Sequence, residues 1–260
     1  MNEIDYGSTE AEMKELADVL LKVGTILMSA GANTGRVRTT VSRMAEAFGY
    51  SINLHISQIS IMLTMLNENG ASLFTVVRVT PPHIINFRTI SGISKMSWSL
   101  VEERWTIHQL NDELKRLEQL SRFPRWLVLT LVGLAGAGFC SLADGNPIEL
   151  AFTFVASLLG LYVRQEALKA SFNPYVAVYF SAFTASLIAG ASSKLGFGDS
   201  QNHAYVTSVL FLIPGVPLIN SFSDILDGNV QNGVTRGFVG FLISFSIALG
   251  ILTSALIYQF

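Results

Sequence analysis

The chain has 260 residues, half of them hydrophobic, and a formal net charge of −2 at pH 7. No basic face interleaved with aromatic residues appears, which argues against nucleic acid as a partner. Cys140 is the only cysteine, so an intrachain disulfide and a thiolate metal cluster are excluded. We expect neither a metal nor another cofactor.

Charged residues are distributed unevenly along the chain. Of the Asp, Glu, Lys and Arg residues, 26 lie before Trp126 and 10 lie from Trp126 onward. This shift predicts an α+β amino-terminal domain over residues 1–122, followed by an α-helical transmembrane domain over residues 123–260. The acidic amino terminus has no signal-peptide pattern, so no cleavage is expected.

Helical spacing opens the amino-terminal domain. Apolar residues recur at that spacing from Leu16 to Leu27, and Gly31 follows where a left-handed cap belongs. A second helix is expected to start at Asn33 or Thr34 and to stop at Gly49. These two helices are expected to pack together.

The pattern then changes to period two, typical of strands. Asn69-Gly70, between the second and third runs, is a strong hairpin signal. Thr106 and Gln109 resemble a capping box that opens a further helix. The expected strands cover residues 52–56, 59–65 and 73–79, and the helix stripe is Ile107, Leu110, Leu114 and Leu117.

Five later segments approach the roughly 20 apolar residues that a spanning helix needs. Basic residues between positions 115 and 125 precede the first, and positive charge favours the cytoplasmic side. We therefore expect a multi-pass protein of the bacterial cytoplasmic membrane with a cytoplasmic amino terminus. The segments are Trp126 to Ala143, Ile148 to Val163, Pro174 to Ala191, Tyr205 to Phe222 and Phe238 to Ile257.

The fourth segment contains Pro214-Gly215-Val216-Pro217, which makes a straight helix improbable. A break at membrane depth is tolerated where it lines a cavity, and transporters use such breaks to hold ions and carboxylates. Pro214, Gly215 and Pro217 are therefore candidate substrate-binding residues. The alternative is a proline kink that serves packing alone.

Polar residues follow directly after the break. Asp224 and Asp227 share one face if the helix continues, and they are candidates for proton coupling. Asn220 and Arg236 are candidates for substrate binding, because a guanidinium can hold either those carboxylates or a substrate carboxylate. Alternatively, Arg236 belongs to a solvated cytoplasmic loop.

Three secondary candidates lie elsewhere. Arg36 follows a glycine at a helix start, where backbone amides favour an anion, although an ordinary turn fits equally well. Asp144 and Glu149 lie in or beside the turn between the first two spans. The scattered histidines have no catalytic partner in a recognised motif and no Gly-rich phosphate loop occurs, so the chain is predicted not to be an enzyme.

Taken in order, these pieces resemble the ThrE-type threonine/serine exporter family. The resemblance covers nearly the whole chain and is carried by Gly31-Ala32-Asn33-Thr34 with Arg36 and Arg38, Asp144-Gly145-Asn146-Pro147, and Pro214-Gly215-Val216-Pro217 with Asp224, Asp227-Gly228, Gly233 and Arg236. The five-span length is more similar to the split, YjjP-like members. This resemblance implies a cytoplasmic domain and pairing with a second small membrane subunit.

The predicted function is therefore that of a transporter subunit. It exports a small carboxylate-bearing metabolite, either threonine and serine or a C4 dicarboxylate such as succinate, and assembles with a second subunit or with itself. The alternative is a membrane-anchored sensor or assembly protein whose cytoplasmic domain binds a ligand or partner. No residue discriminates between the two substrate classes.

Overall fold

The computed structural model describes residues 6–66, 70–82, 84–119, 123–196 and 203–259. The chain divides into two compact units. The amino-terminal unit comprises Met1–Ser121 and Val216–Gly237, and the bundle unit comprises Arg122–Gly215 and Phe238–Phe260. The amino-terminal unit therefore includes a segment from the second half of the sequence.

Two helices form the centre of the amino-terminal unit. Helix α1 spans Tyr6–Ser29 and helix α2 spans Thr34–Ala47. Gly31 has φ +94°, and the Gly31 and Ala32 amides donate to carbonyls of the last turn of α1, which is the arrangement of a Schellman cap. The expected pair of helices is confirmed. The cap at Gly31 and the expected start and end of the second helix are confirmed as well.

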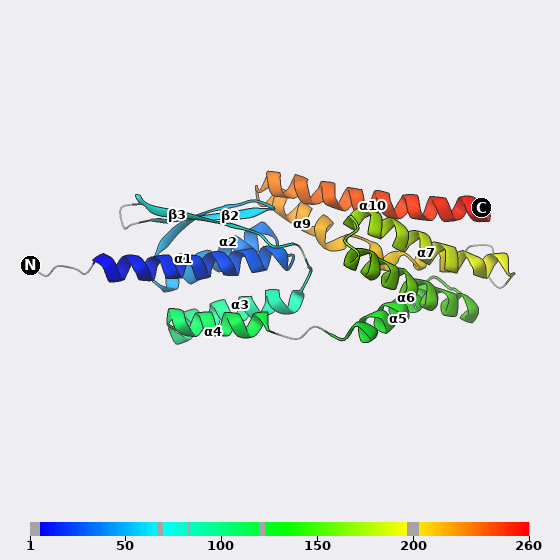
Figure 1. Ribbon diagram of the computed structural model, residues 1–260, viewed down its shortest axis with the longest axis horizontal. Coiled ribbons are helices and arrows are strands. Elements are labelled where there is room, and N and C mark those ends of the chain that lie inside the picture. The colour runs from blue at the N-terminus through cyan, green and yellow to red at the C-terminus, as the bar shows by residue number, and fades with distance from the viewer. Residues whose placement is uncertain (1–5, 67–69, 83, 120–122, 197–202, 260) are drawn as a thin grey trace, which may run out of the picture. The chain divides into compact units, whose positions relative to one another are not determined.

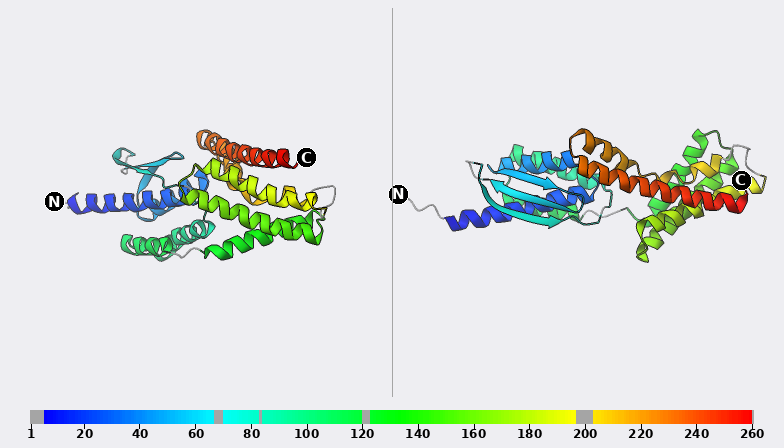
Figure 2. Two further views of the ribbon diagram at one scale, coloured as in Figure 1. Left: turned by 45° about the vertical axis from the view of Figure 1, so that its right-hand side comes forward. Right: turned by 90° about the horizontal axis from the view of Figure 1, so that it is seen from above.

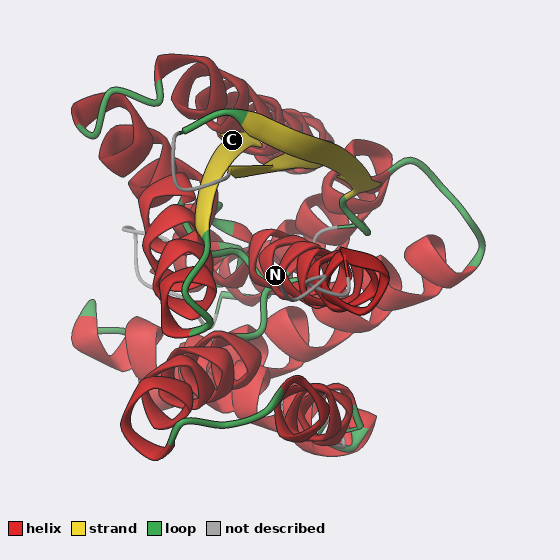
Figure 3. Ribbon diagram, turned by 90° about the vertical axis from the view of Figure 1, so that its left-hand side faces the viewer, coloured by secondary structure: helices red, strands yellow, loops and turns green. Residues whose placement is uncertain are grey.

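A three-stranded antiparallel sheet covers one side of this helix pair (Figures 1 and 3). Alternation places Ile61, Leu63 and Met65 of β2 in the core. In the third strand, Phe74 and Val76 pack on the core. The residues Leu73, Val77 and Val79, which set the period-two pattern of this run, are exposed on the other face. The strands are β1 Ser51–Ile56, β2 Ser60–Leu66 and β3 Ser72–Val79, and Asn69 of the expected hairpin turn lies outside the described residues.

Helices α3, Phe87–Glu103, and α4, Ile107–Glu118, pack on the opposite side of α1 and α2 from the sheet (Figures 1 and 3). The Thr106–Gln109 capping box is present, and Leu110, Leu114 and Leu117 are buried as expected. The sequence pattern did not predict α3. The predicted layout of helices with a small sheet is confirmed for this part of the chain.

The bundle unit is built from long apolar helices. Its first three form successive antiparallel hairpins joined by short turns (Figure 2). Within the described ranges, four helices are long and apolar enough to cross a membrane, which fits four of the five predicted spans. They are α5 Arg125–Leu142, α6 Pro147–Lys169, α7 Pro174–Lys194 and α10 Val230–Tyr258, of which α10 gives its first eight residues to the amino-terminal unit.

The predicted fourth span is broken. Helix α8, His203–Thr207, and a 3₁₀ turn, Leu210–Leu212, end before Pro214, and α9, Gly215–Leu226, continues at an angle of 58°. The bent pair supplies a fifth span only if both halves count as one. Pro217 lies in the first turn of α9, where its missing amide leaves no helical hydrogen bond unmade.

Close helix packing in the bundle unit depends on Gly250 of α10. A Cβ atom there would lie 2.7 Å from the Tyr179 carbonyl oxygen and 2.8 Å from the Phe183 backbone nitrogen. At Gly138 of α5 the same atom would meet nothing within 4 Å. Of these two glycines, only Gly250 requires backbone atoms to move to admit a side chain.

We therefore expect Gly250→Ala to destabilise the bundle unit by about 1–3 kcal/mol, because overpacking forces backbone shifts. The matched variant Gly138→Ala should leave stability unchanged or slightly raised. Thermal unfolding of the purified chain in detergent measures both. Equal unfolding temperatures for the two variants would contradict the close approach.

Candidate functional site: a buried ion pair at the α1–α2 turn

Helix α9 and the start of α10 form a hairpin within the amino-terminal unit. Gly228, with φ +78°, and Asn229 donate to the Ile225 and Asp224 carbonyls and close a second Schellman cap. The Ser221 hydroxyl donates to the Gly233 carbonyl at 2.7 Å, and a Cβ on Gly233 would lie 2.8 Å from the Ser221 carbonyl oxygen. Glycine at position 233 therefore permits the close approach of the two helices.

The hairpin places Asp224 against the start of α2. Both carboxylate oxygens are used: Oδ1 accepts from the Thr34 amide at 2.8 Å and Oδ2 accepts from the Thr34 hydroxyl at 3.0 Å. Asp224 and Thr34 are fully buried. The positive end of the α2 dipole favours a carboxylate here, so the helix terminus offsets part of the cost of burial.

Arg236 completes an ion pair with Asp224. Its Nε lies 3.2 Å from Asp224 Oδ2, although the N–H is not aimed well enough to form a hydrogen bond. Its Nη2 donates to the Ala32 carbonyl at 2.9 Å and lies 3.4 Å from the Met28 sulfur. The Arg236 side chain is 5% exposed, so the cation is held at the carbonyl end of α1 by groups of the protein.

Asn232 links this pair to the sheet. Its Nδ2 donates to the Thr34 hydroxyl at 3.1 Å and to the Ile56 carbonyl at 2.8 Å. We call Thr34, Asp224, Asn232 and Arg236 the buried network. It joins the end of α1, the start of α2, the end of β1 and the α9–α10 hairpin.

The other sequence candidates take different positions. Asp227 is exposed just past α9, and its Oδ2 would lie 3.0 Å from a Cβ on Gly35, so it too lies near the start of α2. Asn220 donates to the Gly31 carbonyl at 2.7 Å. The expected anion site at the start of α2 is thus occupied by the chain's own Asp224.

The proline segment contributes backbone geometry. Pro214 is buried and ends the first half of the broken span, whereas Gly215 starts α9 without a positive φ and with open space where a side chain would stand. The depth of this break in a bilayer and its role in holding substrate stay predictions.

Asp144 and Glu149 belong to the bundle unit and are not part of the buried network. Asp144 is exposed with φ +62° in the turn before α6. Glu149 is fully buried, and its Oε2 accepts from the Asn146 amide at 2.9 Å in a capping box, while Oε1 has no hydrogen-bond partner. Among the described residues, no cluster of three or more His, Cys, Asp or Glu side chains can hold a metal ion.

Sequence analysis did not name Thr34 and Asn232 as individual site residues. Thr34 was expected within the Gly31–Arg36 segment at a helix start, a candidate anion site, yet its partner Asp224 lies 190 positions away in the chain. No local pattern signals a contact over that distance. Asn232 lies among the polar residues that follow the proline break, and that clustering was the sequence signal that could have identified it.

Helices long and apolar enough to span a membrane, together with the broken helix pair, indicate a multi-pass membrane protein. It belongs to the ThrE family, whose model, described as "Putative threonine/serine exporter", matches residues 18–258.

Curated relatives agree with this family. The chain is 28% identical to the "Probable succinate transporter subunit YjjP" of Klebsiella aerogenes, over 93% of each chain. It is also 28% identical to the protein of that name from Escherichia coli K12, over 95% of this chain and 96% of the relative. No solved structure matches the chain.

A third relative is longer. The "Probable threonine/serine exporter" of Mycobacterium tuberculosis is 19% identical over 95% of this chain but only 47% of its own length. The chain therefore spans about half of that protein.

We expect Thr34→Val to destabilise the amino-terminal unit by about 1–3 kcal/mol, because it removes the donor to Asp224 and the acceptor for Asn232 inside a buried network. Thr34→Ser keeps the hydroxyl and serves as the matched control. Urea unfolding of the purified chain, followed by circular dichroism, measures both. A Thr34→Ser variant as unstable as Thr34→Val would show that the hydroxyl is not what matters.

Proposed function

We propose that the chain is a subunit of a secondary transporter that exports a small carboxylate-bearing metabolite across the bacterial cytoplasmic membrane. The domain before the first span, residues 1–122, is cytoplasmic, in keeping with the basic residues at its end. Family membership and the names of the relatives support a transporter subunit. Those names leave threonine or serine and succinate as the substrate classes to test.

The observation that carries this proposal is the Asp224–Arg236 pair. A substrate carboxylate at this position would meet the donors that now hold Asp224: the Thr34 amide, the Thr34 hydroxyl and the Arg236 guanidinium. Asp224 acts as an internal substitute for the substrate carboxylate. Planar bidentate binding by arginine suits both carboxylates equally.

Competition between the two carboxylates couples a proton to the substrate. A proton on Asp224 cancels its charge and leaves Arg236 buried without an anionic partner, which is an expensive state. A substrate carboxylate restores the pairing. Substrate binding and proton uptake by Asp224 therefore favour one another, and the exposed Asp227 takes no part in this exchange.

We expect Asp224→Asn and Arg236→Gln to lower efflux at least about tenfold, because each removes one charge of the exchange. Asp227→Asn makes the same chemical change three residues further on, at an exposed position, and should retain efflux. The measurement is release of succinate or L-threonine from loaded cells at matched amounts of membrane protein.

Size-exclusion elution of the purified variants controls for folding. Suppose that Asp224→Asn elutes as the unaltered chain does and shows the same efflux as Asp227→Asn. The buried pair would then have no part in the mechanism. Undiminished efflux in Arg236→Gln would have the same consequence for substrate binding.

The chain also works in an assembly. The YjjP relatives are named as subunits, and this chain spans about half the length of the Mycobacterium protein. We propose that a second small membrane subunit, or a second copy of this chain, completes the transport path. Exposed apolar residues of α9 and α10, among them Phe222, Leu226 and Phe238, are available for lipid or for that partner.

We expect the chain expressed alone to elute either as an inactive monomer or as an active oligomer. In the first case, co-expression with a short membrane protein encoded beside it should restore efflux. Light scattering after size exclusion gives the assembly state, and efflux from the same membranes gives activity. Full efflux from a monomeric chain would contradict the need for an assembly.

A further inference from the structure

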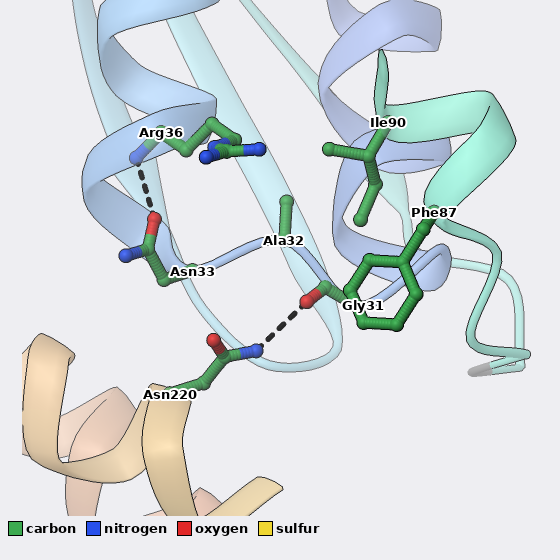
Figure 4. A pocket seen from close by; sticks show the side chains of 7 residues that line it. All are labelled: Gly31, Ala32, Asn33, Arg36, Phe87, Ile90 and Asn220. Carbon is green, nitrogen blue, oxygen red and sulfur yellow. Dashed lines mark hydrogen bonds between the residues drawn. The ribbon is translucent and has the colours of Figure 1, made fainter. Parts of the chain in front are cut away.

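A small pocket lies in the amino-terminal unit, next to the α1–α2 turn and separate from the buried network. Its volume is about 140 Å³. Figure 4 shows Arg36 of α2 extending along one side, Phe87 and Ile90 of α3 on another, and Asn220 of α9 on a third. The lining residues are Gly31, Ala32, Asn33, Arg36, Phe87, Ile90 and Asn220.

The pocket offers one cation. No ion pair or hydrogen bond of the Arg36 guanidinium occurs among the described residues, and its side chain is exposed, whereas its backbone amide donates to Asn33 Oδ1 at 2.8 Å. Asn220 uses its Nδ2 on the Gly31 carbonyl. A guanidinium with free donors beside amide side chains can bind a planar anion at two points.

The start of α2 does not supply this binding. Its Thr34 amide already binds Asp224, and its Arg36 amide already binds the Asn33 side chain. A ligand here would therefore be held by side chains.

The remaining wall is apolar. Phe87 is 61% exposed, and Ile90 lies beneath the surface at 3% exposure. Pockets for drug-sized ligands have volumes of about 300–1,000 Å³, so a pocket of this size admits only a few heavy atoms. One cation and an apolar wall suit a short carbon skeleton that ends in a carboxylate.

We propose that this pocket binds the carboxylate of a small metabolite, with Arg36 holding the carboxylate and Phe87 covering the carbon skeleton. The ligand then contacts the Gly31–Asn33 turn, whose Ala32 carbonyl accepts a hydrogen bond from Arg236. Occupancy of the pocket stabilises this turn in the conformation that keeps α9 and the buried network in place. The choice of metabolite rests on the proposed function, whereas binding at this pocket does not.

Isothermal titration of the full chain in nanodiscs tests the proposal, with succinate and L-threonine as probes. We expect saturable binding of at least one probe. Arg36→Gln should weaken binding at least about tenfold, because a charge-assisted bidentate contact is lost. Arg88→Gln removes the same charge from an exposed neighbour of Phe87 and should bind as the unaltered chain does.

Inorganic phosphate separates carboxylate binding from general anion binding. If phosphate competes for the pocket with the same affinity as the carboxylate probe, the pocket is a general anion site and the carboxylate assignment is wrong. Absence of saturable binding, or equal weakening by Arg36→Gln and Arg88→Gln, also overturns the proposal. Probe binding that Arg36→Gln weakens, in a chain that shows no efflux with any partner, would support the pocket and remove the proposed transport function.

Discussion

The Asp224–Arg236 ion pair is the interaction on which the amino-terminal unit depends. Two charges taken out of water cost several kcal/mol each unless partners compensate them. Here the compensation comes from the turn between α1 and α2, because the carbonyl end of α1 receives Arg236 and the amide end of α2 receives Asp224. One turn thus presents complementary partial charges to both members of the pair.

This arrangement explains why a short segment from the second half of the chain folds with the first. The α9–α10 hairpin brings its charges to that turn, and Asn232 adds a bond to the Ile56 carbonyl at the end of β1. The hairpin requires Gly228 for its left-handed cap and Gly233 for close packing. At the break next to Pro214 the helix direction changes, so that α9 continues at an angle to the helical residues before it.

The proposed exchange depends on a property of such a buried pair. Breaking it by removing one charge leaves the other unpaired, so the pair is stable only as long as both charges are present. In the proposed exchange a carboxylate substrate replaces Asp224, which a neutral solute cannot do. The proposed pocket at Arg36 lies at the same α1–α2 turn, beside a cation that makes no ion pair within the described residues.

The sequence by itself determined the elements whose causes are local. Helical spacing and Gly31 defined α1 and its cap, the Thr106–Gln109 box defined the start of α4, and Pro214 with Pro217 predicted the broken helix. The run of apolar segments indicated the membrane helices, since length and hydropathy are properties of contiguous residues. The sequence also drew attention to Asp224 and Arg236, because charged residues are rare in the second half of the chain.

Only the tertiary structure decided which charges meet. Sequence reasoning left open whether Arg236 faces the carboxylates or solvent. It also gave no reason to expect different environments for Asp224 and Asp227, which are three positions apart. The fold buries Asp224 against Thr34 and leaves Asp227 exposed, because α9 ends between them at Leu226. A contact between residues 190 positions apart depends on how the hairpin packs, and no local pattern of residues encodes that packing.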